Sequence, residues 1–475
     1  MRVALTLAVM ALVSACSSEE SGAPGAAGTG GATSGGGAGG TAGNGTGGFA
    51  GSSGGTGGGA GSGGGAAGLG GTAGSGGTAG AVDVSTATGK LLFGYQGWFA
   101  CEGDGAPPNR WVHWFSQNTP DAQHLTVDMW PDVSELSASE LFPTSLTLPG
   151  GKVAALYSAY TNATVVRHFA WMEDAGIDGV MLQRFVSELK DPAFLALRDK
   201  VAQNVMAGAE AHGRTFAIMY DISGANAATL VDDLKQDWAH LVNDLGVTSS
   251  ARYQRHDNRP LLAIWGLGFS DRPGTPAEAA ALVSYFQNTA QVTLMGGVPT
   301  HWRTLSDDSK TDPAWLFVYR SFDIVSPWSV GRYADDAGAD NFAIGQIAVD
   351  LADAQTHGFD YMPVVWPGFS WKNLNGGPLN QIPRKGGTFW WRQVFNAVSK
   401  GSTMLYGAMF DEVDEGTAMF KIAPTSATVP AGASFVTLDA DGQSLPSDWY
   451  LRLGGAGAKM LRGELPLSPT IPISP

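Results

Sequence analysis

Short apolar runs alternate with segments of helical spacing from residue 91 to the end of the chain. The runs are continuously apolar, which is typical of strands covered on both faces, as in a parallel sheet. The predicted strands are 91–95, 177–182, 215–220, 260–265, 292–296, 322–325, 360–365 and 403–409, with an accessory strand at 154–157. The predicted helices are 165–175, 194–211, 227–245, 276–288 (with Thr275 as its N-cap), 313–319, 343–356, 389–399 and 449–461.

Eight strand–helix units in a chain of 475 residues predict an α/β fold, a closed (β/α)8 TIM barrel. An open, doubly wound sheet is the alternative, and it would normally carry a glycine-rich phosphate loop after its first strand. Residues 94–97 read Gly-Tyr-Gln-Gly and match neither the GxGxxG nor the Walker pattern. The barrel is therefore favoured.

Glycine is concentrated in one stretch of the chain. The protein has 67 glycines, and 31 of the 60 residues from 21 to 80 are glycine, with no Asp, Glu, Lys or Arg among them. Such a segment buries too little apolar surface to offset its ordering entropy. Gly-Gly-Thr-Ala-Gly also recurs, starting at residues 39, 70 and 76. We predict a disordered Gly-rich linker over 17–81, acting as a tether, and the barrel domain over 82–475.

The first residues have the pattern of a bacterial export signal. Arg2 precedes an apolar run over 3–13, which is too short to span a bilayer as a mature helix. The run ends in Val-Ser-Ala-Cys, which resembles the lipobox of bacterial lipoproteins. We predict a signal peptide over 1–16, lipidation of Cys16 and a membrane anchor, and Ser17 in the next position favours the outer membrane or cell surface. An ordinary secretory signal cut at the same residues is the alternative.

Charge and motifs exclude several kinds of partner. The net charge is −15, so the chain lacks the excess of cations that nucleic acid or another polyanion needs. The eight histidines form no HxxxH or HEXXH pattern, and no Gly-x-Ser-x-Gly elbow is present within residues 82–475. The chain has two cysteines, Cys16 and Cys101, which are too few for a cysteine metal cluster. We expect Cys101 to be buried. These patterns predict no cofactor, no metal and no nucleic acid.

Aromatic and polar side chains gather where the predicted strands end, which is where a barrel places its chemistry. Aromatic faces pack on sugar rings and polar groups bind hydroxyls, so the pattern predicts a carbohydrate cleft. Four of the charged candidates could equally be halves of structural ion pairs: Arg184, Asp221, Arg303 and Arg332. The candidate substrate-binding residues are Arg184, Tyr220, Asp221, Trp265, Arg303, Trp328, Arg332, Trp371, Asn373 and Arg384.

Four carboxylates directly follow the last predicted strand: Asp411, Glu412, Asp414 and Glu415. Like charges this close resist ionisation together, so at least one pKa should rise. One protonated and one ionised carboxyl is the pair that glycoside cleavage needs, and residues three apart share a face of a helical turn. A calcium site, whose spacing would not fit the EF-hand pattern, and a solvated acidic loop are the alternatives.

Several short motifs together resemble the glycoside hydrolase family 71/99-like proteins, which include endo-acting α-mannosidases, α-mannanases and α-1,3-glucanases. The motifs are residues 95–99, 112–114, 168–172, 176–179, 367–371 and 410–417. The resemblance implies that Glu412 and Glu415 are catalytic, in a retaining mechanism with participation of the sugar 2-hydroxyl. It also implies that Tyr95, His113 and Trp114 line the substrate cleft. Asp411, another candidate for substrate contact, and Val413 replace the asparagine and tryptophan of the endo-α-mannosidases.

Two classes of function follow from these patterns. The first is a surface-anchored hydrolase of α-linked glycans, favoured by the Glu412 and Glu415 pair. The second is a non-catalytic glycan-binding lipoprotein on the same barrel.

Overall fold

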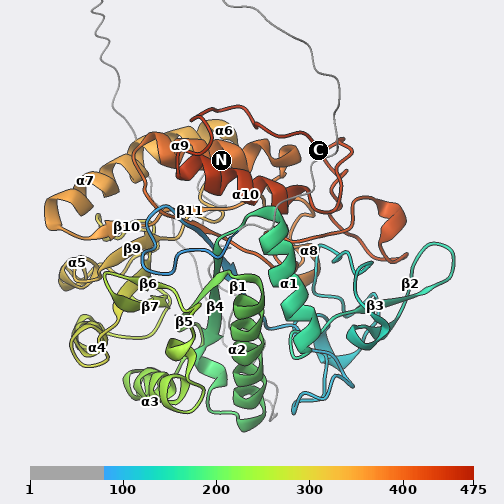
Figure 1. Cartoon of the computed structure of the whole chain (residues 1–475), viewed down its shortest axis with the longest axis horizontal. Coiled ribbons are helices and arrows are strands. Elements are labelled where there is room, and N and C mark those ends of the chain that lie inside the picture. Colours follow the sequence, from blue (N-terminus) through green and yellow to red (C-terminus); the bar gives the residue numbers. More distant parts are fainter. Residues whose placement is uncertain (1–79) are drawn as a thin grey trace, which may run out of the picture. The chain divides into compact units, whose positions relative to one another are not determined.

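A ring of parallel strands lies at the centre of residues 80–475, which are the residues that the computed structural model describes (Figure 1). β1 (Leu91–Tyr95) lies between β4 (Gly179–Phe185) and β12 (Leu405–Gly407) and pairs in parallel with both. From β4 the ladder continues through β5 (Thr215–Asp221), β7 (Arg259–Trp265), β8 (Thr293–Val298) and β9 (Ile324–Pro327).

The ring closes through a strand that is divided in two. β10 (Asp360–Tyr361) pairs with β9, and β11 (Val364–Val365) pairs with β12. Pro363 lies between the two halves and has no N–H to donate, although its carbonyl accepts from Tyr406 N at 3.0 Å. The two halves form the single predicted strand 360–365, and the predicted (β/α)8 TIM barrel is confirmed.

Helices surround the strands, which explains why the strands are buried on both faces (Figure 1). The helix at 276–288 has the predicted bounds: the hydroxyl of Thr275 accepts from Glu278 N, while the Glu278 carboxylate accepts from Thr275 N. The helices are α1 (Asn162–Ala175), α2 (Pro192–His212), α3 (Leu230–Asn243), α4 (Pro276–Asn288), α5 (Ala314–Tyr319), α6 (Asp336–Phe342), α7 (Ala348–His357), α8 (Lys372–Asn375), α9 (Thr388–Ser399) and α10 (Trp449–Leu461).

The structure extends the predicted helix at 343–356 toward its N-terminus. Asp335 caps α6, because its carboxylate accepts from Gly338 N at 2.7 Å, and a π-helical turn at Ala343–Ile347 joins α6 to α7. The predicted accessory strand is β3 (Val153–Leu156), antiparallel to β2 (Phe142–Thr147). β6 (Arg255–His256) pairs antiparallel with the start of β7. Short 3-10 turns cover Ser116–Asn118, Ala138–Glu140, Val186–Glu188, Val247–Ser249, Lys385–Gly387 and Ser426–Thr428.

Several sequence predictions fall on the N-terminal part of the chain. The predicted signal peptide (1–16), the lipidation at Cys16 and the predicted linker as far as residue 79 lie outside the described residues. Within residues 80–475, no helix is both long and apolar enough to cross a membrane.

Candidate active site

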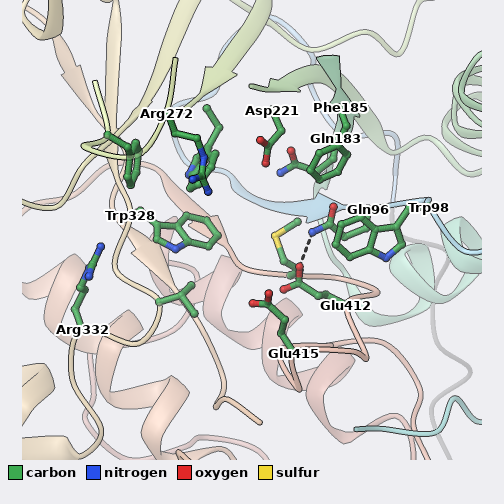
Figure 2. A pocket seen from close by; sticks show the side chains of 14 residues that line it. Gln96, Trp98, Gln183, Phe185, Asp221, Arg272, Trp328, Arg332, Glu412 and Glu415 are labelled. Carbon is green, nitrogen blue, oxygen red and sulfur yellow. Dashed lines mark hydrogen bonds between the residues drawn. The ribbon is translucent and has the colours of Figure 1, made fainter. Parts of the chain in front are cut away.

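A pocket opens where the barrel strands end and the strand–helix loops begin (Figure 2). Its walls come from the ends of β1, β4, β5, β7, β9 and β12, the edge at which a barrel gathers side chains from several strands. The residues that line it are Gln96, Trp98, Gln183, Phe185, Asp221, Trp265, Phe269, Arg272, Trp328, Val330, Arg332, Met409, Glu412 and Glu415.

Two glutamates of the loop after β12 line this pocket and differ in how they are held. Both carboxylate oxygens of Glu412 accept hydrogen bonds, one from the Gln96 amide and one from the Thr417 hydroxyl, each at 2.5 Å. The side chain of Glu415 has no hydrogen-bond or ion-pair partner among the described residues and keeps part of its surface exposed. One glutamate is therefore fixed, and the other is free to meet a ligand.

The turn that follows these glutamates requires glycine. Gly416 has a φ of +69°, and a Cβ at this position would lie 2.9 Å from the backbone of Ser370. A side chain is excluded by both the conformation and the contact. The tight turn lets Thr417 reach back to Glu412.

Asp411 ties this loop to the end of β1. Its carboxylate accepts from Gln96 N at 2.7 Å and from Gly97 N at 2.9 Å. The buried side chain does not line the pocket, so its contacts position Gln96, whose amide in turn holds Glu412. Asp411 therefore acts as a positioning residue.

All four carboxyls of the loop have raised pKa values. Burial raises the pKa of Asp411 to about 7, and burial followed by the charge of Asp414 raises that of Glu412. Burial, Glu412 and Asp414 raise the pKa of Glu415 well above its usual range, and burial also raises that of Asp414. The predicted rise is confirmed. Loss of solvent is the largest cause for all four carboxyls, and like-charge repulsion is the second cause for Glu412 and Glu415.

An aromatic stack forms one wall beside the glutamates. The ring of Trp98 lies between His113, at a centroid distance of 3.9 Å and an angle of 9°, and Phe185, at 5.3 Å and 25°. Because both faces of Trp98 are covered, it offers only an edge to a ligand. Burial lowers the pKa of His113 to about 3, so the imidazole beside Asp414 is neutral near neutral pH.

The opposite side of the pocket carries arginines (Figure 2). The guanidinium of Arg272 lies over the Trp265 ring, 5.4 Å from its centroid, and the Trp328 ring meets Trp265 edge to face at 5.5 Å. Arg332 donates to Asp308 at 2.6 Å and to the Thr300 hydroxyl at 2.9 Å.

The structure brings some of the predicted site residues together and not others. Those that line the pocket are Asp221, Trp265, Trp328, Arg332, Glu412 and Glu415. Those that do not are Tyr95, His113, Trp114, Arg184, Tyr220, Arg303, Trp371, Asn373, Arg384 and Asp411.

Strand alternation explains two of the residues outside the pocket. Successive side chains of a strand point to opposite faces, and Arg184 and Tyr220 point toward α3. There Arg184 forms two hydrogen bonds of 2.6 Å with Asp237, and the Tyr220 hydroxyl donates to the same carboxylate at 2.7 Å. Their neighbours Gln183 and Asp221 point into the pocket.

Protein contacts also account for residues near the first and fifth strands. The Tyr95 hydroxyl hydrogen-bonds His168 Nδ1 at 2.9 Å, and Trp114 donates to the Tyr157 carbonyl at 3.0 Å. Arg303 pairs with the buried Asp350, the structural alternative that its sequence position left open.

The three residues predicted after the seventh strand join loops to each other. Asn373 donates to the carbonyls of Val127 and Ser434. Arg384 donates to the Ala418 carbonyl at 2.8 Å and stacks on Tyr450, while Trp371 is buried against Phe369. These contacts hold the loops around the β12 turn rather than facing the pocket.

Sequence reasoning missed several lining residues. A strict period of two, counted from the last residue of each strand, would have selected Gln183 and Phe185 over Arg184. No comparable signal marks Arg272, which lies seven residues beyond β7. The other residues missed are Gln96, Trp98, Phe269, Val330 and Met409.

One group of side chains among the described residues has the spacing of a metal site, and it lies away from the pocket. The ligand atoms of His256, Asp257 and Asp360 fall within 4.8 Å of one another, at the amino-terminal end of the strands. His256 Nδ1 accepts from Ala87 N, so its Nε2 donates to Asp360 and both ring nitrogens are occupied. No such group of side chains is found at residues 411–415.

The fold is similar to that of known glycoside hydrolases, as comparison with solved structures shows. No protein-family model matches the sequence, and no curated protein matches it. The GH99 endo-alpha-mannosidase from Bacteroides thetaiotaomicron superposes with a TM-score of 0.57 at 12% identity, covering 79% of this chain and 98% of that one. Its complex with bis-tris-propane gives 0.56 at 13% identity, with the same coverage. The chain therefore has the fold of the GH99 endo-alpha-mannosidase.

Proposed function

We propose that the protein is a glycoside hydrolase that cleaves an α-linked glycan with Glu412 as base and Glu415 as acid. The observation that carries this proposal is the shared pocket of two glutamates with raised pKa values, one fixed and one free. Two carboxyls of opposite protonation state at one pocket are the requirement of glycoside cleavage.

The hydrogen bonds assign the two roles. Donors from Gln96 and Thr417 favour the charged form of Glu412, whereas Glu415 receives none. When the pair holds one proton, that proton therefore resides on Glu415. A general acid has to keep its proton at the working pH, and a neighbouring carboxylate helps it to do so.

The reaction follows the retaining route that the family resemblance implies. Glu412 takes the proton of the sugar 2-hydroxyl, whose oxygen attacks the anomeric carbon while the bond to the leaving oxygen breaks. Glu415 gives its proton to that leaving oxygen. In the second step Glu415 takes a proton from water and the water oxygen attacks the anomeric carbon. The bond between that carbon and the 2-oxygen breaks, and Glu412 returns its proton to the 2-oxygen.

The fold supports an α-mannan or related α-glycan as the substrate class. The structurally similar enzyme is an endo-alpha-mannosidase. Trp328 is the partly exposed aromatic ring of the pocket and provides a surface for the apolar face of a sugar. We also propose, on the N-terminal sequence pattern alone, that the enzyme is displayed as an outer-membrane or cell-surface lipoprotein attached through Cys16.

A panel of α-mannans and α-glucans tests the activity through release of new reducing ends. We expect release with the wild-type protein and none with Glu415→Gln, while Glu102→Gln, at an exposed glutamate outside the pocket, retains it. Full activity of Glu415→Gln would overturn the assignment of the acid. Tight binding without release would favour the second candidate, a non-catalytic glycan-binding protein.

A further inference from the structure

The pocket has N–H donors on the side away from the two glutamates. Figure 2 shows Arg272, Trp328 and Arg332 on this side. One terminal nitrogen of each guanidinium and the Trp328 indole N–H have no hydrogen-bond partner among the described residues, and none of the three is fully buried. This side of the pocket, the donor end, therefore has three donors that no described protein group accepts from.

Both guanidinium groups are already fixed in place. Arg272 donates to the Ser223 hydroxyl at 3.0 Å and to Asp271 at 2.5 Å while it lies over Trp265. Asp308, which holds Arg332, also accepts from the backbone N of Thr300 and His301. Fixed donors lose little entropy when a ligand binds, which favours specific recognition.

We infer that the donor end, Arg272 with Trp328 and Arg332, binds one negatively charged oxygen group carried by a sugar of the glycan. This inference rests on the proposed function only in that a glycan occupies the pocket. Carboxylate, phosphate and sulfate groups present several acceptors and no donor, and the planar guanidinium fork matches them better than a single hydroxyl does.

The charges around the site limit how many anionic groups it accepts. Asp271 and Asp308 already balance the two arginines, and the chain carries a net charge of −15. Asp221 is the acid of the pocket whose pKa Arg272 lowers, although burial raises that pKa overall. A dense polyanion would be repelled, so the site fits a single charged substituent in an otherwise neutral glycan.

Matched monosaccharides test the inference without any need for turnover. Binding of glucuronic acid is compared with binding of its uncharged methyl ester, and mannose 6-phosphate with mannose, by ligand-observed NMR titration of the full chain. We expect the charged member of at least one pair to bind about tenfold more tightly. The pair that shows the preference tells whether the group is a carboxylate or a phosphate.

Substitutions then test whether the preference for the charged sugar arises at the donor end. Arg272→Gln should remove the preference for the charged sugar, and Arg332→Lys, which keeps a charge beside Asp308, should weaken that preference. Arg320→Gln is the matched control, because this arginine pairs with Asp353 outside the pocket. Equal binding within both pairs, or a preference that survives Arg272→Gln, would overturn the inference.

The two proposals fail in different ways. If no glycan is hydrolysed but the charged sugar is still preferred, the inference stands and the protein is a binder. If neutral glycans are cleaved and neither charged sugar is preferred, the hydrolase stands and the inference falls.

Discussion

The two ends of the barrel differ in how their carboxylates are paired. At the amino-terminal end, Asp178 accepts from Leu91 N at 3.0 Å and pairs with Arg462 at 2.8 Å, and Asp360 accepts from His256 at 2.8 Å. At the carboxyl-terminal end, no lysine or arginine of the described residues pairs with the four carboxyls of residues 411–415. The first end satisfies its acids, and the second leaves them without cations.

Because of this difference, the carboxylates at the amino-terminal end serve stability and those at the carboxyl-terminal end are suited to chemistry. A carboxylate that has both an N–H donor and a cation partner stabilises the fold. Buried carboxyls without a cation partner have raised pKa values, so they stay protonated at a pH at which exposed carboxyls are ionised. The barrel places the second kind where a ligand can reach it. Substitutions at the two ends should therefore affect different measurements.

The largest effect is expected at Glu415. Replacing it with glutamine removes the proton donor, so kcat on the cleaved glycan should fall on the order of a thousandfold. The unfolding temperature should stay the same or rise, because a carboxyl repelled by Glu412 and Asp414 has been neutralised. Rate assays and thermal unfolding of the same preparation check both expectations, and a large loss of stability would contradict the contrast between the ends.

Substitution of Asp178, at the amino-terminal end of the barrel, should lower stability and leave activity unchanged. Asp178→Ala leaves the buried Leu91 N–H without its acceptor and removes a partner of Arg462, which should cost about 2 kcal/mol of unfolding free energy. Activity per folded molecule should not change.

Asp178→Asn is the matched control, since an amide oxygen can still accept from Leu91 N and should restore part of the loss. Urea unfolding monitored by fluorescence measures all three proteins. An alanine variant as stable as the wild type would show that the pairing at this end contributes nothing.

Gln96 holds Glu412 beside the end of β1, and its substitution should have a smaller effect. Gln96→Leu removes the donor that favours ionised Glu412, so the pKa of Glu412 rises further and kcat falls about tenfold at neutral pH. The pH at which activity rises to its plateau should move upward, a change that a merely structural role would not produce. Gln287→Leu, on the outer helix α4, should leave the profile unchanged.

The sequence predicted the barrel more fully than it predicted the pocket. Continuous apolar runs mark the parallel barrel strands because both of their faces are covered, and that signal is local. Glu412 and Glu415 were found because their spacing is also local. Arg184 was misplaced because strand ends alone do not tell which face a side chain takes, and Arg272 was missed because only the folded loop after β7 brings it to the pocket.

The smallest expected effect is on the pH dependence of stability. Acids whose pKa is raised by folding hold protons that the unfolded chain has released, so their contribution is complete below about pH 4 and is lost as the pH rises through the folded pKa, about 7 for Asp411. The free energy of unfolding should therefore decrease as the pH rises from about 4 to about 7. Asp414→Asn removes one such group and should reduce the slope by at most about 1.4 kcal/mol per pH unit. Asp340→Asn should not change the slope above pH 5, because Arg392 lowers the Asp340 pKa and the group is ionised in both states.

Urea titrations at several pH values measure the slope, and an identical slope in Asp414→Asn would mean that the carboxyl at 414 titrates as it does in water.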